Sequence, residues 1–188
     1  MSTTAQAIKA WEAKNEGQSA AEATVVKLYA QIPPITKLDA SLNSLVECEH
    51  LSLSTNAIDK MVPLNGMPKL KILSIGRNQL KKIEKLEDVS DTLEELWISY
   101  NKITTLDGLS MCTKLRTLYI GNNEIKSWEE LDKLACLPDL KDILLFGNPL
   151  YDNMSKEDAR IEVLKHLPNL GKIDGDLVTP VEREQATG

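Results

Sequence analysis

The chain has 188 residues, of which 42% are hydrophobic and 27% charged, and its formal net charge is −6 at pH 7. This length and composition predict one folded domain rather than a disordered segment. The acidic balance argues against a nucleic acid or an anionic membrane surface as the direct partner.

The N-terminal segment, residues 1–42, predicts a helical cap followed by a half repeat. Thr4 is placed to cap a short helix that carries Ile8 and Trp11 on one face and ends before Gly17. Such a cap is expected because a solenoid otherwise exposes its core at each end.

A second helix is predicted from the capping-box spacing of Ser19 and Glu22, and it would extend to about Ala30. Pro33 and Pro34 would end it, because proline disfavours the helical conformation in the residue before it. Apolar residues then continue into the first turn of the core: Ile32, Ile35, Leu38 and Leu42.

Residues 43–151 contain five copies of one frame, Leu-x-x-Leu-x-Leu-x-x-Asn-x-Ile/Leu. Its asparagines are Asn56, Asn78, Asn101, Asn123 and Asn148, which lie 22, 23, 22 and 25 residues apart. This period and pattern are typical of leucine-rich repeats. The sequence therefore predicts an α/β solenoid with a parallel concave β-sheet, a convex side of short helical or 3₁₀ turns, and helical caps at both ends.

Each part of the frame has a structural meaning. The Leu-x-Leu spacing predicts a short strand with one apolar face, and the asparagine is expected to satisfy backbone groups where the chain turns. After the asparagine, apolar residues recur at every third position, as 3₁₀ turns require. The longer last interval, with a capping-box pattern from Ser127 to Glu130, predicts a true α-helix there.

At the C-terminus, residues 152–175 predict a second cap. Ser155 and Asp158 are placed to begin a helix that carries Ile161, Leu164 and Leu167. Residues 176–188 are polar, and we expect this tail to fray unless a partner orders it.

The residue patterns that support catalysis or metal binding do not occur in the sequence. His50 and His166 have no catalytic or ligand spacing with Cys48, Cys112 or Cys136, and there is no phosphate-binding or hydrolase motif. We therefore expect a protein that is not an enzyme and has no catalytic residues, no metal and no cofactor. The cysteines, which lack CxxC spacing, and the absence of a secretory leader predict reduced thiols in an intracellular protein.

The concave sheet remains as the candidate partner-binding surface. Trp97, Tyr119 and Leu144 occupy the same position of successive strands and should form one column, which Phe146 adjoins. Ile72, Ser74 and Ser99 share this face. A polar rim is expected from four basic residues that flank the strands, although ordinary solvated charge explains them equally well: Lys71, Arg77, Arg116 and Lys141.

Specific segments add a family resemblance to this pattern. The chain resembles the leucine-rich-repeat light chains of axonemal outer-arm dynein, the light chain 1 family, nearly end to end. The most specific segment is 91–101, which contains Trp97. The others are 32–35, 51–56, 73–78, 147–150, 160–163, 167–170 and 182–186.

The resemblance implies a non-catalytic subunit of a ciliary motor. It would bind a dynein heavy chain at the microtubule-binding stalk tip, affect tubulin mainly indirectly, and reside in the cytoplasm and cytoskeleton, in the axoneme of a cilium or flagellum. A leucine-rich-repeat scaffold of a phosphatase or spliceosomal complex is the alternative. The phosphatase regulator needs many more repeats than five, and the spliceosomal protein would lack the Trp97 strand.

Overall fold

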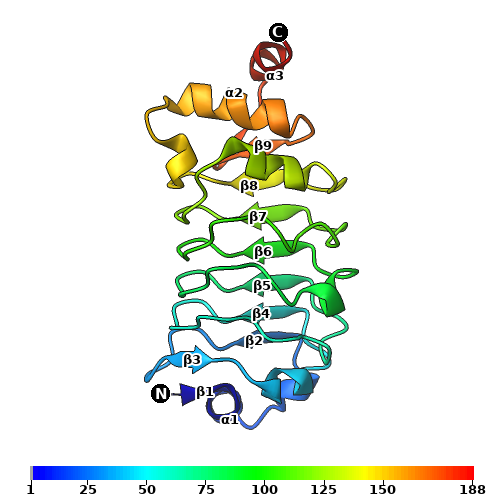
Figure 1. Ribbon diagram of the computed structural model, residues 1–188. Coiled ribbons are helices and arrows are strands. Elements are labelled where there is room, and N and C mark those ends of the chain that lie inside the picture. The colour runs from blue at the N-terminus through cyan, green and yellow to red at the C-terminus, as the bar shows by residue number, and fades with distance from the viewer. Residues whose placement is uncertain (1) are drawn as a thin grey trace.

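Short strands stack into one row along the molecule (Figure 1) in the computed structural model, which describes residues 2–188. All neighbouring strands of the row pair in parallel except the last two, β9 and β10. The predicted leucine-rich-repeat solenoid with a parallel sheet is therefore confirmed. The row consists of β2 (Val25–Lys27), β4 (His50–Ser52), β5 (Ile72–Ser74), β6 (Glu95–Trp97), β7 (Thr117–Tyr119), β8 (Asp142–Leu144), β9 (Lys172–Ile173) and β10 (Asp176–Leu177).

Helical segments cover the two ends and the side of the solenoid opposite the sheet. At the N-terminal end α1 (Thr4–Lys14) lies beside a small sheet of β1 (Ser2–Thr3) and β3 (Ile35–Lys37), and at the other end lie α2 (Lys156–His166) and α3 (Pro180–Thr187) (Figure 1). Within residues 2–188, no helix has the length and apolar character needed to cross a membrane. The 3₁₀ turns are η1 (Ala20–Glu22), η2 (Ala40–Ser44), η3 (Glu87–Val89), η4 (Trp128–Leu134) and η5 (Pro149–Tyr151).

The core is a continuous column of aliphatic side chains. Leu51, Leu73, Leu96, Leu118 and Ile143 are register partners in consecutive strands, and each is almost completely buried. Since side chains alternate along a strand, the residues on either side of each of these point to the concave face. The division of the chain at residues 42, 151 and 175 stays a prediction.

A ladder of asparagine side chains joins each coil to the one before it. In Asn101, Oδ1 accepts a bond from the Leu80 amide at 2.9 Å, and Nδ2 donates to the carbonyls of Ile75 at 3.1 Å and Ile98 at 3.0 Å. The other four repeat the pattern: Asn56, Asn78, Asn123 and Asn148. The ladder thus supplies hydrogen bonds to backbone groups that lie mostly outside the strands and helices.

The N-terminal cap differs from the expectation in two ways. Thr3, not Thr4, caps α1: its hydroxyl accepts from the Gln6 amide at 3.2 Å, and the Gln6 side chain accepts from the Thr3 amide at 3.0 Å. The second helix was a wrong prediction, because after η1 the chain forms β2. Val26 pairs in register with Leu51 and is fully buried, so packing on the sheet outweighs the local capping signal.

Two smaller predictions for apolar residues were also wrong. Ile32 was expected in the first turn of the core, but it is 98% exposed. Ile161 was expected on the buried face of the C-terminal helix, but it is only half-buried, and the buried face carries Ala159, Arg160, Val163 and Leu164 instead.

The α-helix predicted after Ser127 is also wrong, because η4 is a 3₁₀ helix without a side-chain cap. The hydroxyl of Ser127 donates to the carboxylate of Glu129, and Glu130 accepts the amide of Leu106 at 2.8 Å. The Glu130 carboxylate therefore serves the neighbouring coil rather than its own helix start. Trp128 stacks on Tyr151, with ring centroids 5.7 Å apart.

Asp174 accepts hydrogen bonds from the residues that follow β8, near the C-terminal end of the solenoid. Its Oδ1 accepts the amides of Leu145 at 2.7 Å and Phe146 at 3.0 Å, and its Oδ2 accepts the Tyr151 hydroxyl at 2.7 Å. Burial and this carboxylate raise the pKa of Tyr151, so the phenol remains a donor. Donors at the edge of β8 are in this way satisfied within the chain.

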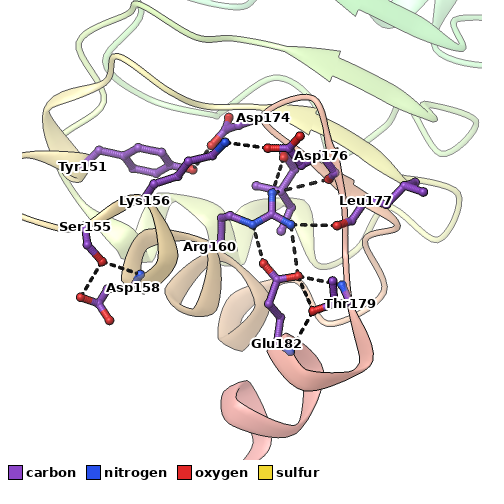
Figure 2. Close-up of polar contacts among 11 residues, drawn as sticks. Tyr151, Ser155, Lys156, Asp158, Arg160, Asp174, Asp176, Leu177, Thr179 and Glu182 are labelled. Atoms are coloured by element: carbon purple, nitrogen blue, oxygen red, sulfur yellow. Dashed lines mark hydrogen bonds and ion pairs between the residues drawn. The ribbon is translucent and has the colours of Figure 1, made fainter.

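The expectation that residues 176–188 fray is wrong, because Arg160 binds them (Figure 2). Its Nε donates to Glu182 Oε1 at 2.5 Å, and its guanidinium also donates to the carbonyls of Ile173 and Leu177 at 2.5 and 3.0 Å. Thr179 and Glu182 form a capping box that begins α3. A buried Arg160, hidden among the helix residues in the sequence, thus orders the tail.

We predict that Asn101→Ala lowers the free energy of unfolding by about 3 kcal/mol, because three bonds are lost and buried backbone groups stay unpaired. Urea unfolding followed by circular dichroism measures the change. Asn169→Ala is the control, since Asn169 is exposed, and it should alter stability by less than about 0.5 kcal/mol. Equal effects of the two substitutions would contradict the assigned role of the ladder.

The Arg160–Glu182 contact predicts acid release of the tail. Arg160 lowers the pKa of Glu182 from 4.5 to about 2. A depressed carboxyl pKa contributes stability that is present above the unfolded pKa and is lost as the pH falls through the folded value. Protease sensitivity of residues 176–188 should therefore rise as the pH is lowered from about 4.5 towards about 2.

Two variants control this experiment. Arg160→Ala leaves Glu182 without its partner, which costs about 3 kcal/mol or more if the carboxylate stays buried, so the tail should be released at neutral pH. Lys165→Ala removes an exposed ion pair with Glu162 on the same helix and should leave the tail protected. A tail equally protected in both variants would contradict the role assigned to the Arg160–Glu182 contact.

Candidate partner-binding surface

The apolar column consists of Trp97, Tyr119 and Leu144, which are register partners on β6, β7 and β8. All three side chains are half-buried on the concave face. The rings of Trp97 and Tyr119 stack with centroids 6.1 Å apart and planes inclined by 22°. The strand spacing in the sequence predicted this alignment, and the structure places the three together.

Carboxylates in the neighbouring column hold the two rings in place. The indole Nε1 of Trp97 donates to Glu95 Oε2 at 3.0 Å, and the hydroxyl of Tyr119 donates to Asp142 Oδ2 at 3.1 Å. Burial, followed by the Asp142 hydrogen bond, raises the pKa of Tyr119, so the hydroxyl stays protonated. The rings are therefore held in one orientation on the concave face, with little freedom left to lose on binding a partner.

His50 lies in the neighbouring column, two strands before Glu95 in the row, and its ring reaches the side of Trp97 that faces the N-terminal end. Its ring meets that of Trp97 edge-on, with centroids 5.6 Å apart, and its Nε2 lies 3.2 Å from Ser74 Oγ. Burial and then the charge of Lys27 lower its pKa. A neutral imidazole thus adjoins the indole, which the spacing of His50 alone did not indicate.

Small residues allow the column to pack closely. A Cβ at Gly121 would collide with the side chain of Leu144, so the glycine lets Leu144 lie over the neighbouring strand. Ser74, the register partner of Trp97, is itself buried, whereas Ile72 is half-buried on the same face. Both were predicted to contribute to the surface, and Ile72 is the more accessible of the two.

A groove adjoins the apolar column where the strands end. Phe146 lies there with 61% of its surface exposed, and it lines a hollow of about 500 Å³ together with Ser99, Tyr100, Leu144 and Lys156 among others. Tyr100 was not predicted from the sequence, because it falls in the turn before Asn101. Its ring is half-exposed and carries the guanidinium of Arg77 at 4.1 Å from its centroid.

The four basic residues predicted as a rim do not lie together. Arg77 follows the C-terminal end of its strand and lies beside Tyr100. In contrast, Lys71, Arg116 and Lys141 precede the N-terminal ends of theirs. Lys71 pairs with Glu49 at 2.8 Å and Arg116 with Glu94 at 3.8 Å, while Lys141 donates to a backbone carbonyl. The charges nearest the apolar column are instead the carboxylates of Glu95 and Asp142.

The arrangement offers apolar and hydrogen-bonding contact rather than reactive groups. In the part of the chain that the structure describes, no three His, Cys, Asp or Glu residues are grouped to hold a metal ion. Cys48 and Cys112 are buried, and burial raises the pKa of each thiol to about 11. Neither thiol is therefore prepared as a nucleophile at neutral pH.

Comparisons with known proteins agree with this architecture. Residues 91–133 match the family described as "Leucine Rich repeats (2 copies)". The dynein axonemal light chain 1 of Chlamydomonas reinhardtii is 61% identical over 89% of this chain and 86% of its own length. Those of Danio rerio and Homo sapiens are 59% and 55% identical, each over 97% of this chain and over 95% and 96% of their own lengths.

Solved structures share the fold at lower identity. The Drosophila melanogaster SNF/U2A′ complex contains a chain that superposes with a TM-score of 0.67 at 20% identity, covering 81% of this chain and 91% of that one. A Listeria monocytogenes internalin superposes with a TM-score of 0.62 at 21% identity, over 82% of this chain and 41% of its own. At such identities the likeness concerns the fold alone.

We predict that His50 titrates below 6.5 and that its protonation disturbs the apolar column, because burial and Lys27 disfavour the charged ring. Folding favours the neutral imidazole, so stability should decrease as the pH falls below 6.5. NMR titration of the His50 ring protons and the Trp97 indole N–H measures both effects. His50→Gln is the control. A Trp97 signal that shifts identically in that variant would disprove the coupling.

Proposed function

The chain belongs to the dynein axonemal light chain 1 family, and from this premise we propose that it is a non-catalytic light chain of ciliary outer-arm dynein. In this proposal it binds a dynein heavy chain, at the microtubule-binding tip of the stalk, and regulates how the motor engages microtubules in the axoneme. The observation that carries the binding part of the proposal is the ordered apolar column on the concave sheet.

The column has the size and chemistry to anchor an amphipathic helix of the heavy chain. Covering about 300 Å² of apolar surface would contribute about 7 kcal/mol before the costs of association. Trp and Tyr are also the residues most often found at the energetic centre of interfaces. Phe146 and the groove beside Tyr100 would extend this contact towards the C-terminal ends of the strands.

The charges around the column favour a helix with basic flanks. Glu95 and Asp142 lie in the column next to the rings, and both are only half-buried. Lys172 partly offsets Asp142, at 3.3 Å. A partner that presents Arg or Lys beside an apolar ridge would therefore complement both features, whereas an acidic helix would be disfavoured.

The effect on microtubule binding would pass through the heavy chain. A light chain of net charge −6 is repelled by an acidic lattice, so direct binding to tubulin is not the expected source of its influence. Bound to the stalk tip, it shifts the balance between strongly and weakly attached states only as far as it binds one of them better. A tenfold preference corresponds to about 1.4 kcal/mol.

The spliceosomal and phosphatase scaffolds considered from the sequence gain no specific support. The similarity to a chain of the SNF/U2A′ complex is at 20% identity and concerns the repeat architecture. In contrast, the relatives named as dynein light chains match at 55–61% identity.

We predict that the double substitution Trp97→Ala with Tyr119→Ala weakens binding to the isolated microtubule-binding domain of the heavy chain. Truncating such anchors costs about 2 kcal/mol or more, roughly thirtyfold in the dissociation constant. Isothermal titration calorimetry measures the affinity.

The matched control is Val46→Ala with Met111→Ala, because both residues are exposed and apolar but lie outside the column. Thermal unfolding verifies that each variant remains folded. Wild-type affinity in the Trp97 and Tyr119 variant would remove the column from the proposed interface, while the family membership would stand.

A further inference from the structure

The strand β2 forms an open edge of the sheet. It pairs with β4 on one side and ends the row of strands at the N-terminal end (Figure 1). The amides of Leu28 and Ala30 donate to Ser52 and Ser54 of the β4 coil at 2.7 and 3.1 Å. Because peptide groups alternate in direction along a strand, those of Val25, Lys27 and Tyr29 face away from β4.

The opposite end of the sheet is closed, which makes this edge distinctive. There, Asp174 accepts amides of the β8 coil, and the antiparallel β10 completes the row. At β2 no described strand performs this role, and Val25, Lys27 and Tyr29 are all exposed. The Tyr29 carbonyl accepts the side-chain amide of Gln31 at 3.0 Å, so the outward groups open to a partner are the Val25 and Lys27 peptides and the Tyr29 amide. Such an exposed edge is a template for a further strand.

A hollow lies along this edge, between β2 and the C-terminal half of α1. Its volume is about 500 Å³, and a second hollow of about 360 Å³ adjoins it; Trp11, Asn15 and Lys27 line both. The helix α1 therefore stands beside the edge without filling the space next to it. An extended segment requires such a space, about 4.8 Å from the strand that it joins.

Apolar side chains surround the hollow. Tyr29 is 52% exposed and Ile32 98% exposed, and Trp11 is only partly buried. These three residues expose apolar surface to water around one open edge, which is typical of an interaction site. Alternate side chains of an added strand would pack on them.

The charge of the hollow indicates which kind of segment fits. Lys14 and Lys27 line it, neither forms an ion pair with another described residue, and no carboxylate lines either hollow. The nearest acidic residue on α1, Glu12, accepts the amide of Ala20 at 2.8 Å. In a chain of net charge −6, this is a local positive site.

We propose that this N-terminal edge binds an extended acidic peptide segment, which adds one strand to the sheet beside β2 and lies between β2 and α1. The peptide groups of Val25 and Lys27 and the amide of Tyr29 form its main-chain hydrogen bonds. Its carboxylates lie near Lys14 and Lys27, and its apolar residues contact Tyr29 and Ile32. A second copy of this chain fits less well, because pairing β2 with β2 would bring two Lys27 side chains together.

The test uses the full ¹⁵N-labelled chain and a synthetic peptide of alternating Glu and Val, about ten residues long. NMR titration should shift the amide signals of Val25, Lys27 and Tyr29. A fully N-methylated peptide of the same sequence should not bind, because it lacks the N–H groups of a strand. Equal binding of the two peptides, or no binding of the first, overturns the proposal.

Charge reversal supplies the matched pair of variants. Lys14→Glu with Lys27→Glu should weaken peptide binding about tenfold or more. Lys60→Glu with Lys102→Glu changes the net charge equally at exposed positions elsewhere and should leave affinity within about twofold. Equal weakening in both double variants would reduce the interaction to overall charge and overturn the proposal.

Two further measurements distinguish peptide binding at β2 from binding on the concave face and from self-association. The Trp97→Ala and Tyr119→Ala variant should bind the peptide as the wild type does, because the apolar column is not part of this edge. A loss of binding in that variant would place the peptide on the concave face and overturn the proposal.

Sedimentation of the unliganded protein tests whether a second copy of the chain binds at β2. A dimer that Lys27→Pro dissociates would assign the edge to self-association and overturn the peptide assignment.

Discussion

The asparagine ladder is the constraint on which the rest of the structure depends. Each side-chain amide bonds to the backbone of two successive coils, as Asn101 does to Leu80, Ile75 and Ile98. Leaving such groups unpaired in the interior would cost more than the bonds themselves contribute. The ladder therefore sets the register of neighbouring strands, and this register places Trp97 directly beside Tyr119.

The features that repeat could be predicted from the sequence, and those that occur once could not. The frame predicted the solenoid, the parallel sheet and the alignment of Trp97, Tyr119 and Leu144, because each depends on spacing alone. The strand at Val26 escaped prediction because its capping-like flank indicated a helix, while burial against Leu51 decided the outcome. Arg160, Tyr100 and His50 escaped because contacts distant in sequence determine what they do.

The two polar systems of the protein act in different ways. At the C-terminal cap, one guanidinium satisfies several carbonyls and a carboxylate, which joins residues 176–188 to α2. On the concave face, Glu95 and Asp142 each hold one aromatic ring by a single bond. The first system stabilises the end of the chain, and the second restricts side chains that remain open to a partner. The carboxylates beside the rings also make this surface favour a positively charged partner over an acidic one.

The three tryptophans lie in three separate parts of the molecule. Trp11 lines the hollow beside β2, Trp97 belongs to the apolar column, and Trp128 stacks on Tyr151 near the C-terminal cap. Replacing any two of them by phenylalanine would leave one intrinsic fluorophore in one region. The protein thus contains its own set of spectroscopic reporters, through which events at either end can be distinguished from events on the sheet without attaching a dye.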